Sequence, residues 1–235
     1  MKNVGQILAN WHNSLPAKIE LGGLYSRNPI AHKWKAPFRC NVLRETVFWR
    51  LEDLLTQSFD LHQKGYALGA RILLRSGFET TATLIYLNQL TASVLDGGLN
   101  FHTFSDKTST LLLGSRNDTT KHKSINIVTV LEKCDKRYPG LKSIYDDLSE
   151  SAHPSYEGTC IGYSTVDHEN YVTLFSNRWD EMYGSGHLRS MLACMQLFEA
   201  EYDDIWTSNM VQLEAWLEKN DPILEATKPL PSKYQ

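Results

Sequence analysis

Apolar residues recur at helical spacing along most of the chain. The first set is Val4, Ile7, Leu8 and Trp11, which predicts a short amphipathic helix that ends near Asn13 to Pro16. Gly65 and the Gly97-Gly98 pair stand just past two longer apolar sets, as is common at helix ends. The remaining predicted helices span residues 38–64, 66–96, 99–113, 125–138 and 141–153, with one long helix or two at 186–220.

The apolar period changes after Pro154. Two stretches, 159–166 and 171–175, are rich in β-branched and aromatic residues, and Asp167 to Asn170 between them supplies residues typical of turns. These features predict a β-hairpin. The expected fold class is therefore all-α, a multi-helix bundle with a small β-hairpin after His153.

The positions of the prolines and glycines between the apolar sets predict a single helical domain over residues 1–235. An N-terminal helix and a long irregular connection, marked by Pro16, Pro29 and Pro37, occupy residues 1–36. The bundle core then covers 37–153, the hairpin 159–176 and the C-terminal helix or helices 186–220. The residues after Pro222 are expected to form a loosely held tail.

Charge is distributed unevenly. The 235 residues are 42% hydrophobic and 22% charged, with a formal net charge of −3, which argues against a strongly basic nucleic-acid-binding protein. Residues 18–44, however, carry a net charge of +5, and residues 196–221 carry −6. The two segments are either solvated faces or attract each other, within the fold or between subunits.

Neither a membrane segment nor a cofactor motif is expected. No apolar run approaches membrane-spanning length, and the N-terminus lacks the apolar core of a signal peptide. The 4 cysteines are widely spaced, which favours reduced thiols and a cytoplasmic location. Glu150 and His153 have a spacing used in di-metal bundles, but no second copy follows, and there is no glycine-rich phosphate loop. We therefore expect no metal and no cofactor.

Polar residues four positions apart mark two of the predicted helices. Tyr145, Ser149 and His153 follow one stripe of the 141–153 helix, which Pro154 should end. The buried-looking 66–96 helix carries a second set, Arg71, Arg75 and Glu79. We expect these six side chains to meet where the two helices pack.

The cluster has two interpretations. An internal ion pair between Arg75 and Glu79 would fix the packing, because buried charges are generally paired. Alternatively, Arg71 or Arg75 points into a cleft and holds a phosphate or carboxylate. Under the second interpretation Arg71, Arg75, Glu79, Tyr145 and Ser149 bind the ligand, and His153 is the candidate catalytic residue because histidine titrates near neutral pH.

The combination of Arg75 and Glu79 with the later Tyr145-x-x-Leu-Ser-x-x-x-His-Pro run and a hairpin resembles uncharacterised bacterial helical proteins of the HEPN and abortive-infection groups. The resemblance covers residues 38–175. It implies a homodimer that acts through binding or assembly, in defence against phage.

HEPN ribonucleases pair an arginine with a histidine a few residues later. Two stretches match this spacing, Arg27-Asn28 with His32, and Arg116-Asn117 with His122. The implied chemistry is RNA cleavage without a metal, in which histidine moves a proton and arginine stabilises charge on the phosphate. The basic, aromatic segment His32 to Arg39 would then contact RNA.

Three functions thus stay open. They are a HEPN-like binding protein without catalysis, a metal-free ribonuclease of that type, and a small-anion-binding or scaffold protein.

Overall fold

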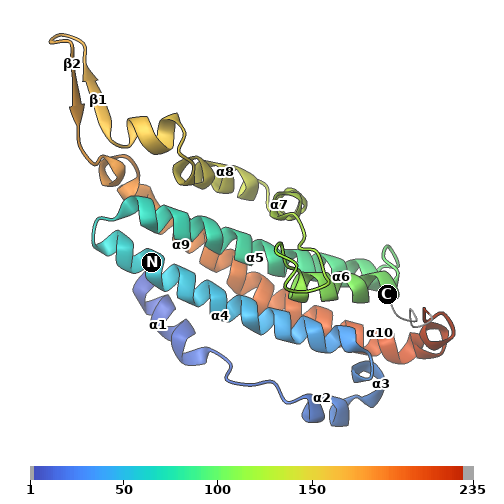
Figure 1. Ribbon diagram of the computed structural model, residues 1–235. Helices are drawn as coiled ribbons and strands as arrows, with labels where there is room; N and C mark the ends of the chain where they lie inside the picture. Colours follow the sequence, from blue (N-terminus) through green and yellow to red (C-terminus); the bar gives the residue numbers. More distant parts are fainter. Residues whose placement is uncertain (1–2, 230–235) are drawn as a thin grey trace. The chain divides into compact units, whose positions relative to one another are not determined.

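The computed structural model describes residues 3–229 (Figure 1). Within them lie ten α-helices, two π-helical segments and one two-stranded sheet, which confirms the all-α bundle with a small hairpin. The helices are α1 (Val4–Ser14), α2 (Leu21–Arg27), α3 (Pro29–His32), α4 (Lys35–Gln63), α5 (Ala67–Leu95), α6 (Phe101–Leu113), α7 (Ile127–Asp135), α8 (Leu141–Ala152), α9 (Trp179–Glu199) and α10 (Trp206–Ala226). The other elements are η1 (Tyr156–Ile161), β1 (Ser164–Asp167), β2 (Val172–Phe175) and η2 (Ala200–Ile205).

Contacts divide the chain into two compact units that alternate along the sequence. Unit 1 comprises residues 1–15, 47–82 and 131–198, and unit 2 comprises 16–46, 83–130 and 199–235. Helices α4 and α5 contribute residues to both units. That the whole chain forms one domain stays a prediction.

Unit 1 is built on an antiparallel pair formed by the second half of α4 and the first half of α5. The Ser58 hydroxyl donates to the Ala70 carbonyl (2.8 Å), and Arg50 Nε donates to Thr80 Oγ1 (3.2 Å). Gly77 lets the helices approach closely, because a Cβ there would lie 3.1 Å from Leu55. Helix α1 packs its apolar face against α4 and α9, where Trp11 lies edge-on to Phe48 and to Phe198 with ring centroids 5.7 Å and 5.1 Å apart.

Unit 2 has a polar connection inside its apolar core. Glu201 of η2 is fully buried, and its carboxylate accepts a hydrogen bond from the Asn88 side chain of α5 (2.7 Å). The Asn209 side chain of α10 donates to the Asn88 carbonyl (3.3 Å). A buried polar network stabilises a fold only when its members are hydrogen-bonded, so these contacts fix how α5 packs against η2 and α10.

The connection between α1 and α4 is helical over much of its length, contrary to the prediction of an irregular segment. Pro29 is the first residue of α3, and the Asn28 side chain caps that helix by accepting from the Ala31 amide (3.0 Å). Pro37 lies in the first turn of α4, where its missing N–H costs no helical hydrogen bond. Both prolines therefore lie within helices instead of breaking them.

The predicted hairpin is present, but β1 is shorter than expected. Residues Tyr156–Ile161 form the π-helical turn η1 in place of the start of a strand. Ser155 caps this turn, since its hydroxyl accepts from the Gly158 amide (3.3 Å). β1 pairs antiparallel with β2 from Ser164–Phe175 to Asp167–Val172.

The C-terminal helical region begins earlier and ends later than predicted. It starts at Trp179 and runs through α9, η2 and α10 to Ala226, so Gly184 and Gly186 lie inside α9. Pro222 is inside α10, and the residues just after it are helical and not a tail. The last part of the predicted tail, residues 230–235, lies outside the described residues. Among residues 3–229, no helix has the length and apolarity needed to cross a bilayer.

Candidate functional site

The structure brings together five of the six residues of the predicted polar cluster, all within unit 1. Arg75 of α5 donates through Nε to the Ser149 hydroxyl (2.9 Å) and through Nη2 to the Tyr145 hydroxyl (2.8 Å) of α8. Glu79 lies 3.0 Å from Arg75 Nη2 and also accepts from the Tyr145 hydroxyl (3.0 Å). The Arg75–Glu79 ion pair is therefore tied to the facing helix.

Arg71 extends the same contact by one helical turn. Its Nε donates to Ser151 Oγ (2.8 Å) and its Nη2 to the Asp147 carbonyl (3.0 Å). The guanidinium carbon lies 3.9 Å from the centre of the Tyr183 ring of α9, a cation–π contact. Burial lowers the pKa of the Arg71 guanidinium. Burial, together with a hydrogen bond to Glu157, raises the pKa of Tyr183 to about 12.

His153 is separate from the other cluster residues. It is the C-cap of α8, with an extended backbone (ψ 146°), because Pro154 disfavours a helical residue before it. Helix α8 therefore ends at Ala152, one residue before His153, so His153 does not continue the stripe of Tyr145 and Ser149. The His153 side chain is exposed. Within residues 3–229, no hydrogen bond joins its side chain to the cluster.

The contacts of Arg71 and Arg75 favour the packing interpretation of this cluster. Each guanidinium uses Nε and one Nη to hold α8 through groups of the chain itself. Two residues that contribute, Ser151 and Tyr183, were not identified from the sequence. Ser151 follows Asp147 by one helical turn and so could have been placed on the face toward Arg71, whereas Tyr183 carries no such signal.

The two arginine–histidine pairs of the ribonuclease hypothesis differ in their surroundings, both within unit 2. Arg116 is exposed and His122 half-buried in the loop after α6. The Ser115 amide donates to the His122 carbonyl (2.8 Å), which brings the backbone beside Arg116 next to that of His122. Arg27 and His32, in contrast, both contact the Glu214 carboxylate, and His32 Nε2 is 3.0 Å from it. His32 is buried, and its Nε2 is already in contact with a carboxylate of the chain.

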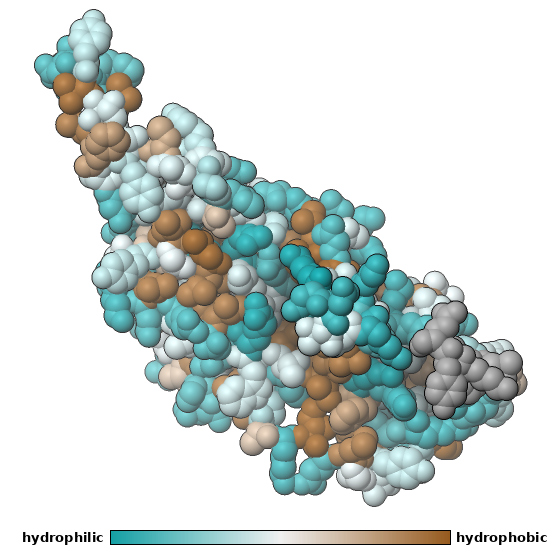
Figure 2. Space-filling model, in the orientation of Figure 1, coloured by the Kyte–Doolittle hydropathy of each residue, from teal (hydrophilic) through white to brown (hydrophobic). Residues whose placement is uncertain are grey.

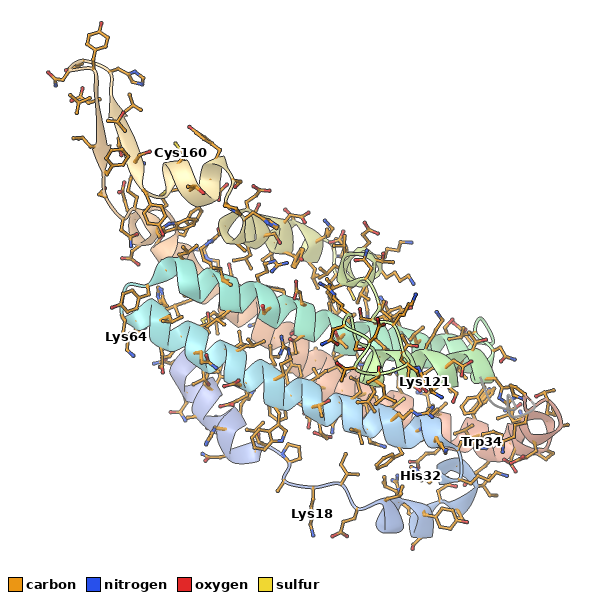
Figure 3. The ribbon with its side chains drawn as sticks, viewed as in Figure 1. Lys18, His32, Trp34, Lys64, Lys121 and Cys160 are labelled. Carbon is orange, nitrogen blue, oxygen red and sulfur yellow. The ribbon has the colours of Figure 1, made fainter. Side chains whose placement is uncertain are left out.

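A basic pocket opens in unit 2 where the start of α4 meets the start of α6. Its volume is about 300 Å³. Figure 3 labels His32 and Trp34, which mark the α3–α4 junction beside it. The pocket is lined by Lys33, Trp34, Lys35, Arg39, Phe101, His102, Ser105, Asp106, Lys228 and Pro229. Four residues of the predicted RNA-contacting segment 32–39 thus line one cavity.

Trp34 forms the wall of this basic pocket. Its indole N–H donates to Asp221 (3.0 Å), and its ring packs edge-on against Phe101 with centroids 5.4 Å apart. The ammonium groups of Lys33 and Lys228 lie 5.6 Å and 5.0 Å from the ring centre. The ring is therefore held rigidly, and cations surround it.

The cations of the pocket are not equally available to a ligand. Lys33 pairs with Asp221 (2.7 Å) and Glu225 (3.0 Å), and these contacts raise the pKa of Lys33. Arg39 uses Nη1 to contact the Ser105 carbonyl (3.2 Å) and hydroxyl (3.3 Å) of α6. Lys35 is exposed, and its side chain has no ion pair among residues 3–229. Lys35 and the rest of the Arg39 guanidinium are the groups that could meet an anion.

Of the two alternatives for the charged segments, the structure shows attraction within the fold, because Lys33 of the basic 18–44 segment pairs with Asp221 of the acidic 196–221 segment, and Arg27 pairs with Glu214. The residues that complete the pocket from elsewhere, Phe101, His102, Asp106 and Lys228, were missed. No spacing in the sequence connects them with Lys35 or Arg39, because only the packing of α6 and the end of α10 brings them close.

Among the described residues, no three histidine, cysteine, aspartate or glutamate side chains form a group that could hold a metal ion. Comparisons of the chain with protein-family models, with curated proteins and with solved structures gave no match.

Proposed function

We propose that the protein is a non-catalytic binding protein that holds a small phosphate-bearing ligand in the basic pocket of unit 2. The observation that carries this proposal is the lining of the pocket. Five of its lining residues are basic, Lys33, Lys35, Arg39, His102 and Lys228, and one within the described chain, Asp106, is acidic. Lys33 and Lys228 are paired with carboxylates, so Lys35 and Arg39 are the cations that carry the proposal.

The chemistry of the lining favours phosphate. Arginine binds phosphate through a planar fork, and lysine adds a flexible point charge. The pocket also borders the first turn of α6, where the helix dipole favours an anion. At about 300 Å³ the cavity lies at the lower end of ligand pockets, which favours a small phosphorylated molecule over a polymer.

Calorimetric titration of the full chain with inorganic phosphate and with a mononucleotide tests the proposal. Replacement of Arg39 or Lys35 by glutamine should lower the affinity by about tenfold or more, because each change removes a charge-assisted contact. Lys64→Gln is the matched control, since Lys64 is an exposed lysine of unit 1 (Figure 3).

Three outcomes would contradict this function. In the first, neither phosphate nor the mononucleotide binds. In the second, Lys64→Gln weakens binding as much as Lys35→Gln does. In the third, an RNA oligonucleotide binds while phosphate and mononucleotide do not, which would assign segment 32–39 to RNA.

The HEPN-like assignment, with assembly as a homodimer and a part in phage defence, belongs to the same proposal. The fold is compatible with it, and a binding function without catalysis agrees with an exposed His153 that lies apart from the polar cluster.

A metal-free ribonuclease is a second candidate, favoured by the Ser115–His122 backbone hydrogen bond, which brings the backbone beside Arg116 next to that of His122. Incubation of a single-stranded RNA with the wild type in the presence of a chelator should then give cleavage products. His122→Ala should abolish cleavage, with His168→Ala, an exposed histidine of the hairpin, as the control. Intact RNA with the wild type would exclude this activity.

A further inference from the structure

The β-hairpin of unit 1 exposes apolar side chains on both of its faces. In Figure 1 it extends away from α8 and α9 of the same unit, and brown hydrophobic residues are visible on it in Figure 2. Phe175 is 81% exposed, Leu174 57%, Val166 53% and Val172 44%. A lone two-stranded ribbon is only marginally stable in water, and exposed apolar strands commonly mark interaction sites.

The hydrogen-bonding register shows which backbone groups of the hairpin face outward. The Ser176 amide donates to the Tyr163 carbonyl (3.0 Å). The backbone N–H and C=O groups of these two residues therefore point inward, toward the other strand of the hairpin. Inward and outward pairs alternate along an antiparallel ladder. Thr165–Leu174 and Asp167–Val172 therefore face inward. The outward N–H and C=O groups are those of Ser164 and Val166 on β1 and of Thr173 and Phe175 on β2.

The two outer edges of the hairpin are not equivalent. On β1, Arg178 Nη1 donates to the outward Ser164 carbonyl (3.2 Å), and the strand ends in the charged Asp167. Charges and covering side chains protect an edge from further pairing. Strand β2, Val172–Phe175, carries no charge, and in the described chain no strand pairs with its outer edge.

We propose that the outer edge of β2 pairs antiparallel with β2 of a second copy of this chain, which forms a four-stranded sheet across a two-fold axis. Outward residues must pair with outward residues, and the register that uses both outward residues of each strand places Thr173 opposite Phe175 of the second copy. Leu174 then lies opposite Leu174 of the second copy, on the axis. Such a self-matching register is what an isologous contact requires.

Two features favour a second copy over another partner. The edge is uncharged and therefore gives no complementarity to a basic or acidic peptide. The antiparallel arrangement also places the loops with Asp167 and Glu169 at opposite ends, so their like charges do not meet. Two mostly exposed aromatic residues per copy, Tyr171 and Phe175, offer roughly 300 Å² per copy. A contact between two short strand edges belongs to the small, weak interfaces, which bury less than about 1,200 Å².

Light scattering of the full chain, at concentrations up to about 1 mM, tests the proposal. The wild type should dimerise as its concentration rises. Thr173→Pro should be monomeric at all concentrations, because it removes an outward N–H that the hairpin itself does not use. The matched control, Val166→Pro, removes an outward N–H of β1 and should dimerise like the wild type.

A cross-linking experiment does not depend on whether the proline variants fold. In a Cys160→Ser background, which removes the exposed thiol, Leu174→Cys should form a disulfide between copies under oxidation, because the two Cα atoms would be about 4.5 Å apart. Thr165→Cys, at the centre of β1, should stay monomeric. A wild type that is monomeric throughout, a dimer that persists in Thr173→Pro, or equal cross-linking of the two cysteine variants would overturn the proposal.

Discussion

The Arg75 guanidinium connects two helices of unit 1 through three side chains. It contacts Ser149, Tyr145 and Glu79, and it is mostly buried, with 24% of its side chain exposed. Removal of such a group leaves its partners without their hydrogen bonds, and a buried polar atom without a partner costs more than the bond itself contributed. The cluster therefore contributes to stability even if it binds no ligand.

Arg75→Ala should lower the free energy of unfolding by about 1–3 kcal/mol, because Tyr145, Ser149 and Glu79 lose a charged donor. Chemical denaturation measures this change. The control is Arg189→Ala, an exposed arginine of α9 in the same unit, which should change stability by less than about 0.5 kcal/mol. An Arg75→Ala variant as stable as the wild type would show that the cluster does not fix the packing.

A second residue-scale prediction concerns His187, a buried histidine whose Nε2 lies 3.0 Å from Ser58 Oγ. Burial, with smaller contributions from His62 and Arg71, lowers its pKa from 6.5 to about 4. The unfolded chain therefore takes up a proton before the folded chain does. Stability from this group is complete above about pH 6.5 and is lost as the pH falls toward 4, by up to about 3 kcal/mol.

Denaturation at a series of pH values, with wild type and His187→Gln, measures this effect. The wild type should lose more stability between pH 7 and about 4.5 than the variant does. Equal losses would mean that His187 is not kept neutral by its surroundings.

At the scale of elements, the long helices could be predicted because their apolar stripes repeat over many turns. Helix α3 could not be predicted, because the sequence Asn28-Pro29 is typical of a turn. In the structure the Asn28 side chain accepts from the Ala31 amide and caps a helix whose first residue is Pro29. The turn η1 was missed for a related reason: its β-branched residues favour a strand, whereas the Ser155 cap selects a helix. Of the residues that line the basic pocket, only those of one segment, Lys33 to Arg39, could be predicted from the sequence.

Two glycine substitutions in different elements of unit 1 should change stability with opposite sign. Gly5→Ala in α1 should raise stability by about 0.5–1 kcal/mol, because alanine favours a helix and its Cβ would meet Phe59 at an ordinary 3.5 Å. Gly158→Ala in η1 should lower stability, since its Cβ would overlap the His153 carbonyl at the end of α8. Thermal denaturation compares the two, and a lower Tm for Gly5→Ala would contradict this account of α1 packing.

At the scale of the whole molecule, the net charge of −3 conceals a local excess of positive charge. The acidic segment of unit 2 neutralises Arg27 and Lys33, while Lys35 and the free part of Arg39 stay beside the pocket. Binding of phosphate there should weaken as salt increases, because exposed charges are screened within about 10 Å at 0.1 M salt. Titration at two salt concentrations measures this dependence. An affinity for phosphate that is independent of salt would argue that Lys35 and Arg39 do not bind it.

The most direct measurement uses the tryptophan indoles as reporters in an NMR titration of the full chain with inorganic phosphate. The chain has 6 tryptophans, and Trp34 is the one that lines the basic pocket. We expect the Trp34 indole N–H resonance to shift with saturation and the Trp11 and Trp179 resonances of unit 1 to stay in place. In Arg39→Gln the midpoint of the Trp34 shift should move to about tenfold higher phosphate or more. A Trp34 resonance that stays in place up to high phosphate, or that shifts with the same midpoint in Arg39→Gln, would contradict the proposed function.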